Sequence, residues 1–444
     1  MGPEWVAIIA LVALFVIGTV LPINMGALAY VAAWLVGMYA LDLDEKEILA
    51  GVSGDLILTL IGVTYLFAIA RNNGTVDLIV RTAVRGVGGR VALIPWVMFG
   101  VTALLTAIGA ASPAACAIIG PIALGFAGRY KINPLMMGMF VVHGAQGGGF
   151  SPISIYGIIT NSVMEDAGLP TSEITVFLAS LVVNTLMALL LFVLLGGREL
   201  MSRRVDPDED LGGHLSEDLH RGGASVAARG TGDTTTATTA ATGMRTEQLL
   251  TLLAFVAVAV IALAFDKNIG FVAITAAVIL AMLSPNQHKD AIKQVAWPTV
   301  LLVAGVSTYA TILTTAGSPE FVGRWAAGLG AVALGALILC YVGGVVSAFA
   351  SSTALLPVIV PIAVPLIADG GVNAALFIAA LAVSSTIVDV SPFSTNGALM
   401  LANRPDTITE PAYYKQILVY SVIVVVVGPL LVWAALVLPG WGAA

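Results

Sequence analysis

The chain has 444 residues, of which 59% are hydrophobic and only 10% are charged, with a formal net charge of −7. Soluble globular domains carry about 25% charged residues, so this composition excludes a protein with an ordinary water-facing surface. The acidic balance gives no indication of nucleic-acid binding, and the two isolated cysteines, Cys116 and Cys340, predict neither a disulfide nor a metal cluster.

Ten apolar segments in chain order predict complete membrane spans, because about 20 helical residues cross the hydrocarbon layer. They are 5–21, 23–41, 52–71, 135–165, 172–197, 246–265, 269–284, 297–315, 373–402 and 413–438. Two further apolar stretches, 88–130 and 329–369, are too long for one crossing. Their small-residue breaks, Ala111-Ser112-Pro113 and Ser351-Ser352-Thr353, predict re-entrant helical hairpins with tips at mid-membrane.

A polar segment, 198–245, separates the two halves, and its acidic and Thr/Ala/Gly runs predict a disordered linker. Arginines gather in 71–90, which we interpret as a surface helix, and again in 198–204. Basic loops favour the cytoplasm, so the acidic loops 42–47 and 165–173 would lie outside. This predicts a multi-pass protein of the inner (plasma) membrane, with both termini outside and the linker in the cytoplasm.

The two halves repeat each other at an offset of 240 residues. The matches include Ala110/Ala350, Ser112/Ser352, Pro121/Pro361, Asn133/Asn373, Ser151/Ser391, Pro152/Pro392, Ser154/Ser394 and Gly157/Gly397, with Gly62/Gly305 and Gly74/Gly317 at an offset of 243. Because the first half begins outside and the second inside, the repeats would have inverted topology, which is typical of transporters. A duplicated membrane scaffold without transport is the alternative.

The predicted fold is therefore all-α and polytopic, and each repeat contains scaffold helices, a re-entrant hairpin and a broken helix. The first repeat, 1–197, has scaffold helices in 1–90 and 166–197, the hairpin 88–130 and the broken helix 133–165. The second repeat, 246–444, has scaffold helices in 246–328 and 405–438, the hairpin 329–369 and the broken helix 373–402.

The broken helices carry signals for new helix starts inside the membrane. Glycines 147–149 interrupt the fourth span, and Ser151-Pro152 follows with residue types preferred at a helix N-cap and first turn. Ser391-Pro392 repeats this in the ninth span, and Ser112-Pro113 has the same form at the first hairpin tip. Half-helices beginning there would aim free N–H groups and positive dipole ends into the interior, which suits an anion.

The predicted substrate-binding residues surround these starts: Gly148, Gly149, Ser151, Pro152, Ser154, Ser391, Pro392, Ser394, Thr395 and Asn396. No lysine or arginine occurs at membrane depth in these segments. N–H and hydroxyl donors would therefore hold the substrate carboxylates, with help from a co-bound cation. For each serine or threonine the alternative is a helix-packing contact or a bond to its own backbone.

Two ionisable residues lie deep in predicted spans, and an intramembrane charge favours a functional role. Asp389 could ligate sodium or carry a proton, or it could cap the half-helix near Ser391. His143 could contribute to ion coupling or be a packed neutral imidazole. Oxygens for a cation are offered by Ser112, Ser352, Thr353 and Asp389.

With these residues, the chain resembles the ion transporter superfamily, which includes the divalent anion/sodium symporters, and is most similar to the MatC-type malonate and dicarboxylate carriers. The resemblance implies a homodimer whose transport domains slide as rigid bodies against a scaffold, the elevator form of alternating access. It also implies two sodium sites, one lined by Ser112, Gly147, Gly148 and Gly149 and the other by Ser352, Thr353, Asp389 and Ser391. The symporters carry Ser-Asn-Thr at both hairpin tips. In this chain the tips are Ala111-Ser112-Pro113 and Ser351-Ser352-Thr353, so the first sodium site lacks the asparagine and the threonine of the family pattern.

We therefore expect a secondary transporter and no enzyme activity. The expected cargo is a small organic dianion of the malonate, succinate and malate class, carried by symport with sodium as the coupling ion and no other cofactor. The alternatives are a cation/proton antiporter or a proton-coupled anion carrier on the same fold. An intramembrane protease would need a His-Glu-x-x-His helix or paired carboxylates, and the sequence contains neither.

Overall fold

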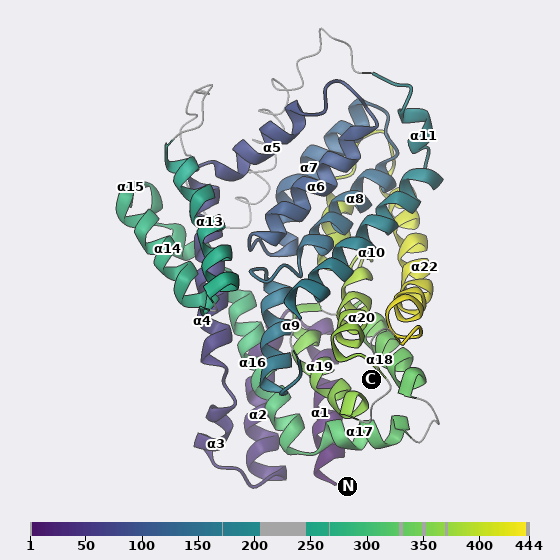
Figure 1. The fold of residues 1–444 in the computed structure, drawn as a ribbon. Coiled ribbons are helices and arrows are strands. Elements are labelled where there is room, and N and C mark those ends of the chain that lie inside the picture. The colour runs from purple at the N-terminus through teal and green to yellow at the C-terminus, as the bar shows by residue number, and fades with distance from the viewer. Residues whose placement is uncertain are drawn as a thin grey trace.

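The computed structural model of the chain describes residues 2–170, 172–204, 246–265, 267–327, 332–348, 352–368 and 372–440. Regular secondary structure in these ranges is entirely helical, which confirms the all-α fold (Figure 1). The predicted linker lies outside the described residues from 205 onward, and so does Ser351 at the second hairpin tip.

The first half contains a long series of apolar helices with short polar ones between them. They are α1 (Pro3–Val20), α2 (Met25–Ala40), α3 (Glu45–Ala50), α4 (Gly54–Asn72), α5 (Thr75–Arg85), α6 (Leu93–Ala107), α7 (Ser112–Arg129), α8 (Pro134–Gly148), α9 (Ile155–Asp166), α10 (Glu173–Leu194) and α11 (Gly197–Leu200). The arginine-rich segment that we interpreted as a surface helix contains α5.

The second half has a matching series. It consists of α13 (Thr246–Phe265), α14 (Ile269–Leu283), α15 (Pro285–His288), a 3-10 turn (Ala291–Gln294), α16 (Trp297–Thr315), α17 (Ser318–Ala327), α18 (Val332–Ser347), α19 (Ser352–Ala368), α20 (Ala374–Ile387), α21 (Thr395–Ala402) and α22 (Glu410–Leu436). After α4 and α16 the chain turns at Gly74 and Gly317, whose φ angles are 77° and 72°. The helices that follow these glycines, α5 and α17, lie at opposite ends of the molecule in Figure 1.

Seven described helices are long and apolar enough to cross a membrane, namely α1, α4, α7, α10, α13, α16 and α22. Ten complete spans were predicted; four of these are short or divided, and one of the seven helices, α7, was not among the ten. The predicted spans at α2 and α14 are apolar but have only 16 and 15 residues. The fourth and ninth spans are each divided into two helices, α8–α9 and α20–α21, while α7 was predicted as one limb of a hairpin.

Glycines allow helices from opposite halves to cross at very short range. α2 packs against α16, where a Cβ added to Gly305 would lie 2.0 Å from the carbonyl oxygen of Gly26. α14 packs against α4, where a Cβ on Gly62 would lie 2.7 Å from the carbonyl oxygen of Gly270. Small residues at a membrane helix interface permit this backbone approach, so both crossings depend on the missing side chains.

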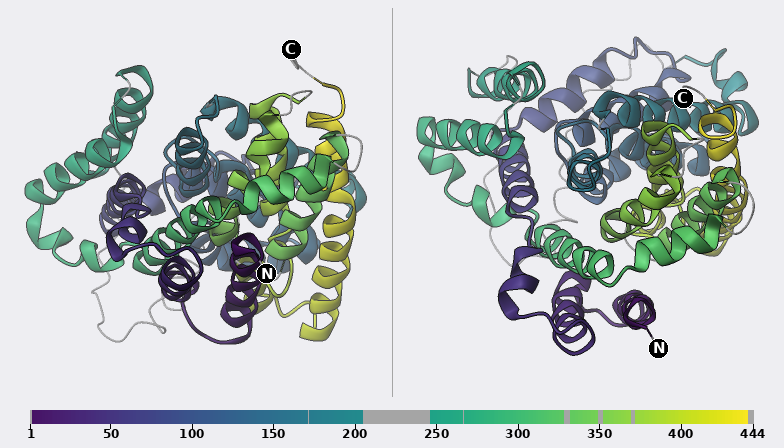
Figure 2. Two further views of the ribbon diagram at one scale, coloured as in Figure 1. Left: turned by 90° about the horizontal axis from the view of Figure 1, so that it is seen from below. Right: turned by 60° about the horizontal axis from the view of Figure 1, so that its bottom comes forward.

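The helices form two packed groups. In the hairpin group, which we define as α6–α10 and α18–α22, each hairpin packs on the first limb of its own broken helix, and α7 and α19 contact the second limb of the other half, α21 and α9. In the frame, defined as α1–α4 and α13–α16, α2 joins α16 and α4 joins α14. The groups touch where α16 meets α19 and α4 meets α9. Figure 2 shows α13 and α14 projecting at one edge, far from the yellow α22.

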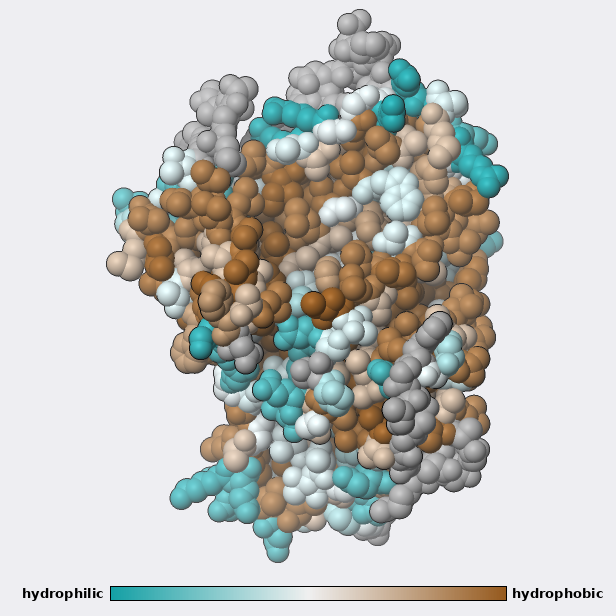
Figure 3. Space-filling model, in the orientation of Figure 1, coloured by the Kyte–Doolittle hydropathy of each residue, from teal (hydrophilic) through white to brown (hydrophobic). Residues whose placement is uncertain are grey.

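The surface has a broad apolar belt with polar ends (Figure 3). The basic segment 198–204 contacts the end of α7, where the Arg203 guanidinium donates to the carbonyl oxygens of Tyr130 and Lys131, at 2.6 and 3.3 Å. Arg90 also pairs with Arg204 through the backbone. A strip of polar surface crosses the lower middle of the belt, where Figure 1 places α9, α16 and α19.

We expect Gly305→Ala to destabilise the protein by about 1–3 kcal/mol, because the new methyl group must displace the backbone of α2. The midpoint of thermal unfolding in detergent measures this. Gly100→Ala is the matched control, since nothing lies within 4 Å of a Cβ at Gly100 in α6 and alanine favours the helix. Equal midpoints for the two variants would show that the α2–α16 crossing tolerates separation.

Candidate functional site

Both broken helices contain a short turn between their limbs. α8 ends at Gly148 and α9 begins at Ile155, while α20 ends at Ile387 and α21 begins at Thr395. The predicted helix starts at Ser151 and near Ser391 were wrong by three residues, because the N-cap residues are Ser154 and Ser394.

The shift follows from a folded turn ahead of each half-helix. The Ser154 hydroxyl donates to the carbonyl oxygens of Ser151, at 2.6 Å, and Gly149, and it accepts from the amide of Gly157 at 3.4 Å. In the second half, Ser394 donates to the carbonyl of Ser391 at 2.7 Å and accepts from Gly397 at 3.3 Å. These two hydroxyls therefore stabilise backbone, a role that differs from the substrate contact predicted for them.

Gly157 and Gly397 make the turns possible. A Cβ at either glycine would lie 2.0 Å from the carbonyl oxygen of Ser151 or Ser391, so the turn folds directly onto the first helical turn. The repeated Ser-Pro-x-Ser-x-x-Gly sequence is thus one structural unit, in which the second serine caps the helix and the glycine admits the turn. The repeat match had contained both glycines, but their role was not predicted.

A cavity of about 330 Å³ lies where four helix starts converge. It is lined by Ala110, Ala111, Ser112, Pro113, Ala114, Gly149, Ile155, Tyr156, Thr299, Leu302, Thr353 and Thr395. These residues belong to the beginnings of α7, α9, α19 and α21, to the first break, and to α16 of the frame. Its size lies at the lower end of the roughly 300–1,000 Å³ that is usual for small-molecule sites.

The cavity is suited to an anion although none of its described lining residues is a lysine or arginine. The first amides of a helix have no partner within that helix, and the aligned peptide dipoles give its N-terminus a partial positive charge. Four such ends that face one space can donate several N–H groups to carboxylate oxygens. Thr353 and Thr395 add hydroxyl groups to the lining.

Asp389 lies beside this cavity in a network of side chains. The Asn396 amide nitrogen donates to the Asp389 carboxylate and to the Ser112 hydroxyl, both at 2.8 Å. Asp389 is 8% exposed, and the part of the chain that the structure describes brings no lysine or arginine into an ion pair with it. Ser394 caps α21, so the interpretation of Asp389 as the cap of that half-helix is wrong.

The remaining predicted ion-site residues are dispersed. Thr353 lines the cavity, whereas the Ser352 hydroxyl pairs with that of Ser347 at 2.7 Å. Gly148 packs against α6, since a Cβ there would lie 1.9 Å from the carbonyl oxygen of Ala103. A Cβ on Gly147 would lie 3.4 Å from the Cβ of Asn184, so this glycine faces α10.

His143 is a buried junction between helices and is absent from the described lining of the cavity. Its Nδ1 lies 2.8 Å from Asn184 Oδ1, and its Nε2 lies 2.6 Å from the Tyr420 hydroxyl. Asn184 turns its amide nitrogen toward Ser180, so the oxygen faces the imidazole and the ring proton sits on Nδ1. This geometry matches the packed neutral imidazole that was the alternative to a coupling role.

Two polar side chains in the cavity lining were missed by the sequence analysis. Tyr156 is the second residue of α9, and Thr299 comes from α16 of the frame. Nothing in an isolated apolar segment distinguishes a cavity tyrosine from a packed one. The 240-residue offset could have indicated it, because it pairs Tyr156 with Asn396.

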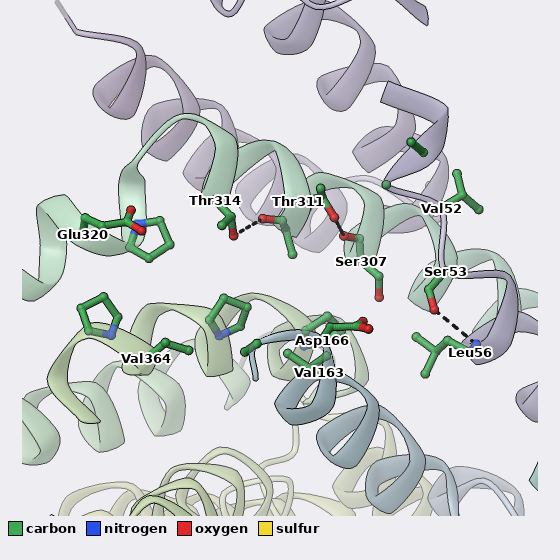
Figure 4. Close-up of a pocket in the computed structure, with 18 residues that line it drawn as sticks. Val52, Ser53, Leu56, Val163, Asp166, Ser307, Thr311, Thr314, Glu320 and Val364 are labelled. Carbon is green, nitrogen blue, oxygen red and sulfur yellow. Dashed lines mark hydrogen bonds between the residues drawn. The ribbon is translucent and has the colours of Figure 1, made fainter. Parts of the chain in front are cut away.

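A separate crevice of about 570 Å³ lies along the boundary between the frame and the hairpin group (Figure 4). One wall carries the polar side chains Ser307, Thr311 and Thr314 of α16, and the opposite wall is α19. Three prolines of α19, spaced four residues apart at Pro357, Pro361 and Pro365, belong to that wall. The described lining residues also include Asp166 and Glu320 and contain no basic side chain.

Comparisons with known proteins agree with this architecture. The Alcanivorax borkumensis YdaH transporter has a similar fold, with a TM-score of 0.53 and 12% sequence identity over 87% of this chain and 86% of that chain. At this identity the similarity concerns the fold alone. A search of curated proteins found no significant match.

These features define the chain as a helical membrane transporter. Residues 1–149 match the family described as the N-terminus of the dicarboxylate carrier protein MatC, and residues 268–441 match the citrate transporter family. The two matched ranges are therefore similar to a MatC-type carrier domain and to a citrate-transporter domain, and the chain is a carrier and not an enzyme. The resemblance to MatC-type carriers inferred from the sequence is confirmed.

The division between capping and lining residues predicts two kinds of variant. Ser154→Ala and Ser394→Ala should each lower stability by about 1–2 kcal/mol, because they leave a helix start uncapped. Thr395→Val keeps the shape of a cavity-lining side chain and removes only its hydroxyl, so stability should stay unchanged while stabilisation by added succinate or citrate falls. Thermal unfolding with and without these anions measures both, and a destabilised Thr395→Val protein would contradict the assignment.

Proposed function

We propose that the chain is a cation-coupled secondary transporter of small di- or tricarboxylates. The observation that carries the proposal is the convergence of four helix starts on one cavity without a basic side chain. Such a site binds carboxylates through backbone N–H groups and hydroxyls, with Thr353 and Thr395 nearest to the anion. A buried dianion held in this way would benefit from a cation close by.

We assign the cation position to Ser112, Asp389 and Asn396, where oxygen atoms gather beside the cavity. An ionised Asp389 carboxylate accepts hydrogen bonds and cannot donate them. The amide nitrogen of Asn396, which is a donor, must therefore be the atom that faces it. The Asn396 amide oxygen then has no partner among the described residues. Sodium is the expected cation because hard cations prefer oxygen ligands.

The packing supports an elevator mechanism with a revised division of the chain. From the sequence, 166–197 and 405–438 were assigned to the scaffold. The helices there, α10 and α22, contact α8, α20 and α18, so we group them with the moving part. The hairpin group would slide against the frame along the α16–α19 boundary, where the crevice already separates the two (Figure 4). We further propose inverted repeats, a homodimer and the inner-membrane orientation given above.

Proton coupling is the second candidate, and one observation favours it. Asp389 is the only buried acidic residue within the described ranges, and it lies next to the cavity. A single carboxylate that alternates between charged and neutral forms could carry a proton together with the anion.

Uptake of labelled succinate into proteoliposomes tests the proposed function. We expect accumulation with an inward sodium gradient, competition by malonate or citrate, and a loss of roughly tenfold or more in Asp389→Asn, because about 1.4 kcal/mol of lost binding gives a factor of ten. Uptake driven by a pH gradient without sodium would select proton coupling. Parent-like uptake by Asp389→Asn would remove the assigned cation position, and failure of every carboxylate to accumulate or compete would remove the function.

Cross-linking tests the proposed movement. In a chain with Cys116 and Cys340 replaced by alanine, Ser307→Cys on α16 and Val364→Cys on α19 place two thiols on opposite walls of the crevice. A flexible bifunctional thiol reagent joining them should stop uptake. The control pair is Tyr341→Cys and Val426→Cys, which lie together on α18 and α22 inside the hairpin group. If uptake survives the first cross-link, the two groups do not slide at this boundary.

A further inference from the structure

The two halves of the site are related by the repeat, yet they carry different chemistry. At the offset of 240 residues, Ser112 pairs with Ser352, Gly149 with Asp389, and Tyr156 with Asn396. Tyr156 and Asn396 are both the second residue of a half-helix, and each reaches the hairpin tip of the opposite half. The comparison is therefore between positions that have the same place in the fold.

In the first set of positions, Ser112, Asp389 and Asn396, all three residues supply oxygen ligands. Asn396 joins the Ser112 hydroxyl to the Asp389 carboxylate through bonds of 2.8 Å, and its amide oxygen stays unpaired within the described part of the chain. Asn396 is fully buried, so leaving that oxygen without a donor is costly unless something else binds it. A monovalent cation would satisfy it together with the carboxylate.

In the related set of positions, Ser352, Gly149 and Tyr156, two of the three lack such ligands. Gly149 stands where Asp389 supplies a carboxylate, and Tyr156 stands where Asn396 supplies an amide oxygen. A Cβ added to Gly149 would lie 2.8 Å from ring atom Cδ2 of Tyr156, so the aromatic ring already fills the space of a side chain there. The phenol faces Ser352 and Thr353, and the Ser352 hydroxyl is taken by Ser347.

We infer that each chain has a single cation site, at Ser112, Asp389 and Asn396, and that the ring of Tyr156 plugs the position related to it by the repeat. This inference rests on the proposed transport function and sets its stoichiometry. One monovalent cation moving with a fully ionised dianion leaves one negative charge uncompensated. Each transport cycle would then carry net negative charge, and its rate would depend on the membrane potential.

Equilibrium binding of radioactive sodium to the purified full-length chain tests the number of sites without requiring transport. We expect one sodium ion per chain, loss of that ion in Asp389→Asn, and unchanged binding in Tyr156→Phe, which keeps the ring. Two ions per chain, or one ion that persists in Asp389→Asn, would overturn the inference. Absence of sodium binding would also overturn it, while leaving a proton-coupled carrier open to the uptake measurement.

Restoring the lost ligands gives a second test. Gly149→Asp combined with Tyr156→Asn makes the first-half position chemically equivalent to the second, and it should raise binding from one to two sodium ions per chain. Gly149→Asp alone is the control, since the remaining ring would still occupy the space. If the double variant fails to fold, as judged by thermal unfolding, the number of sodium ions bound by the parent and by Asp389→Asn still distinguishes one cation site from two.

Uptake separates this inference from the function on which it rests. Accumulation of succinate with a sodium Hill coefficient near one, carrying net negative charge in a potential-clamped proteoliposome, supports both. Accumulation with a coefficient near two would refute the single site and leave the transporter intact. Binding of one sodium ion by a chain that accumulates no carboxylate would support the single cation site and refute the proposed transport function.

Discussion

A backbone N–H group that is removed from water must find an acceptor, and in a bilayer only the protein or its cargo can provide one. The starts of α7, α9, α19 and α21 converge on one cavity deep in this fold. Side chains of the protein accept some of these N–H groups, since Ser154 and Ser394 cap two of the helices. Gly157 and Gly397 leave room for the turn before each of these helices to fold back. The helix starts that line the cavity have further N–H groups without a partner in their own helix, and in the proposed carrier these groups would bind the negatively charged cargo.

The two halves of the chain are more alike in the backbone geometry around the site than in the side chains that line it. The glycine crossings of α2 with α16 and of α14 with α4 are near copies of each other, as are the two capped turns. The side chains placed on these copies have diverged. Asp389 and Asn396 offer oxygen atoms, whereas Gly149 and Tyr156 offer an aromatic ring in the corresponding place. A symmetric scaffold can thus support an asymmetric site, because backbone geometry depends on a few glycines and serines and leaves the neighbouring positions free.

The sequence predicted the all-α fold, the hairpins' helical limbs and both broken helices, because glycine runs and Ser-Pro pairs act locally. It misplaced the helix starts by three residues, since Ser151 and Ser154 are both acceptable caps and the choice depends on how closely the turn folds back, which brings the Ser151 carbonyl against Gly157. It could not assign α10 and α22 to a packed group, because an apolar helix does not specify its neighbours. Tyr156 was missed for a similar reason, because its place in the cavity lining depends on what lies opposite it. His143 was a candidate because ionisable residues are rare in membrane helices, and only the folded structure shows its contacts with Asn184 of α10 and Tyr420 of α22.

The proline row on α19 has a mechanical consequence for the boundary between the two helix groups. Proline has no amide hydrogen, so Pro357, Pro361 and Pro365 cannot donate to the carbonyl oxygens four residues earlier, and those oxygens lack the usual helical hydrogen bond. Water that enters the crevice can donate hydrogen bonds to these carbonyl oxygens, and such bonds exchange quickly. In the sliding movement proposed above, α16 would therefore pass a wall whose exposed carbonyl oxygens exchange hydrogen bonds with water, so few direct bonds between the two helices would have to break.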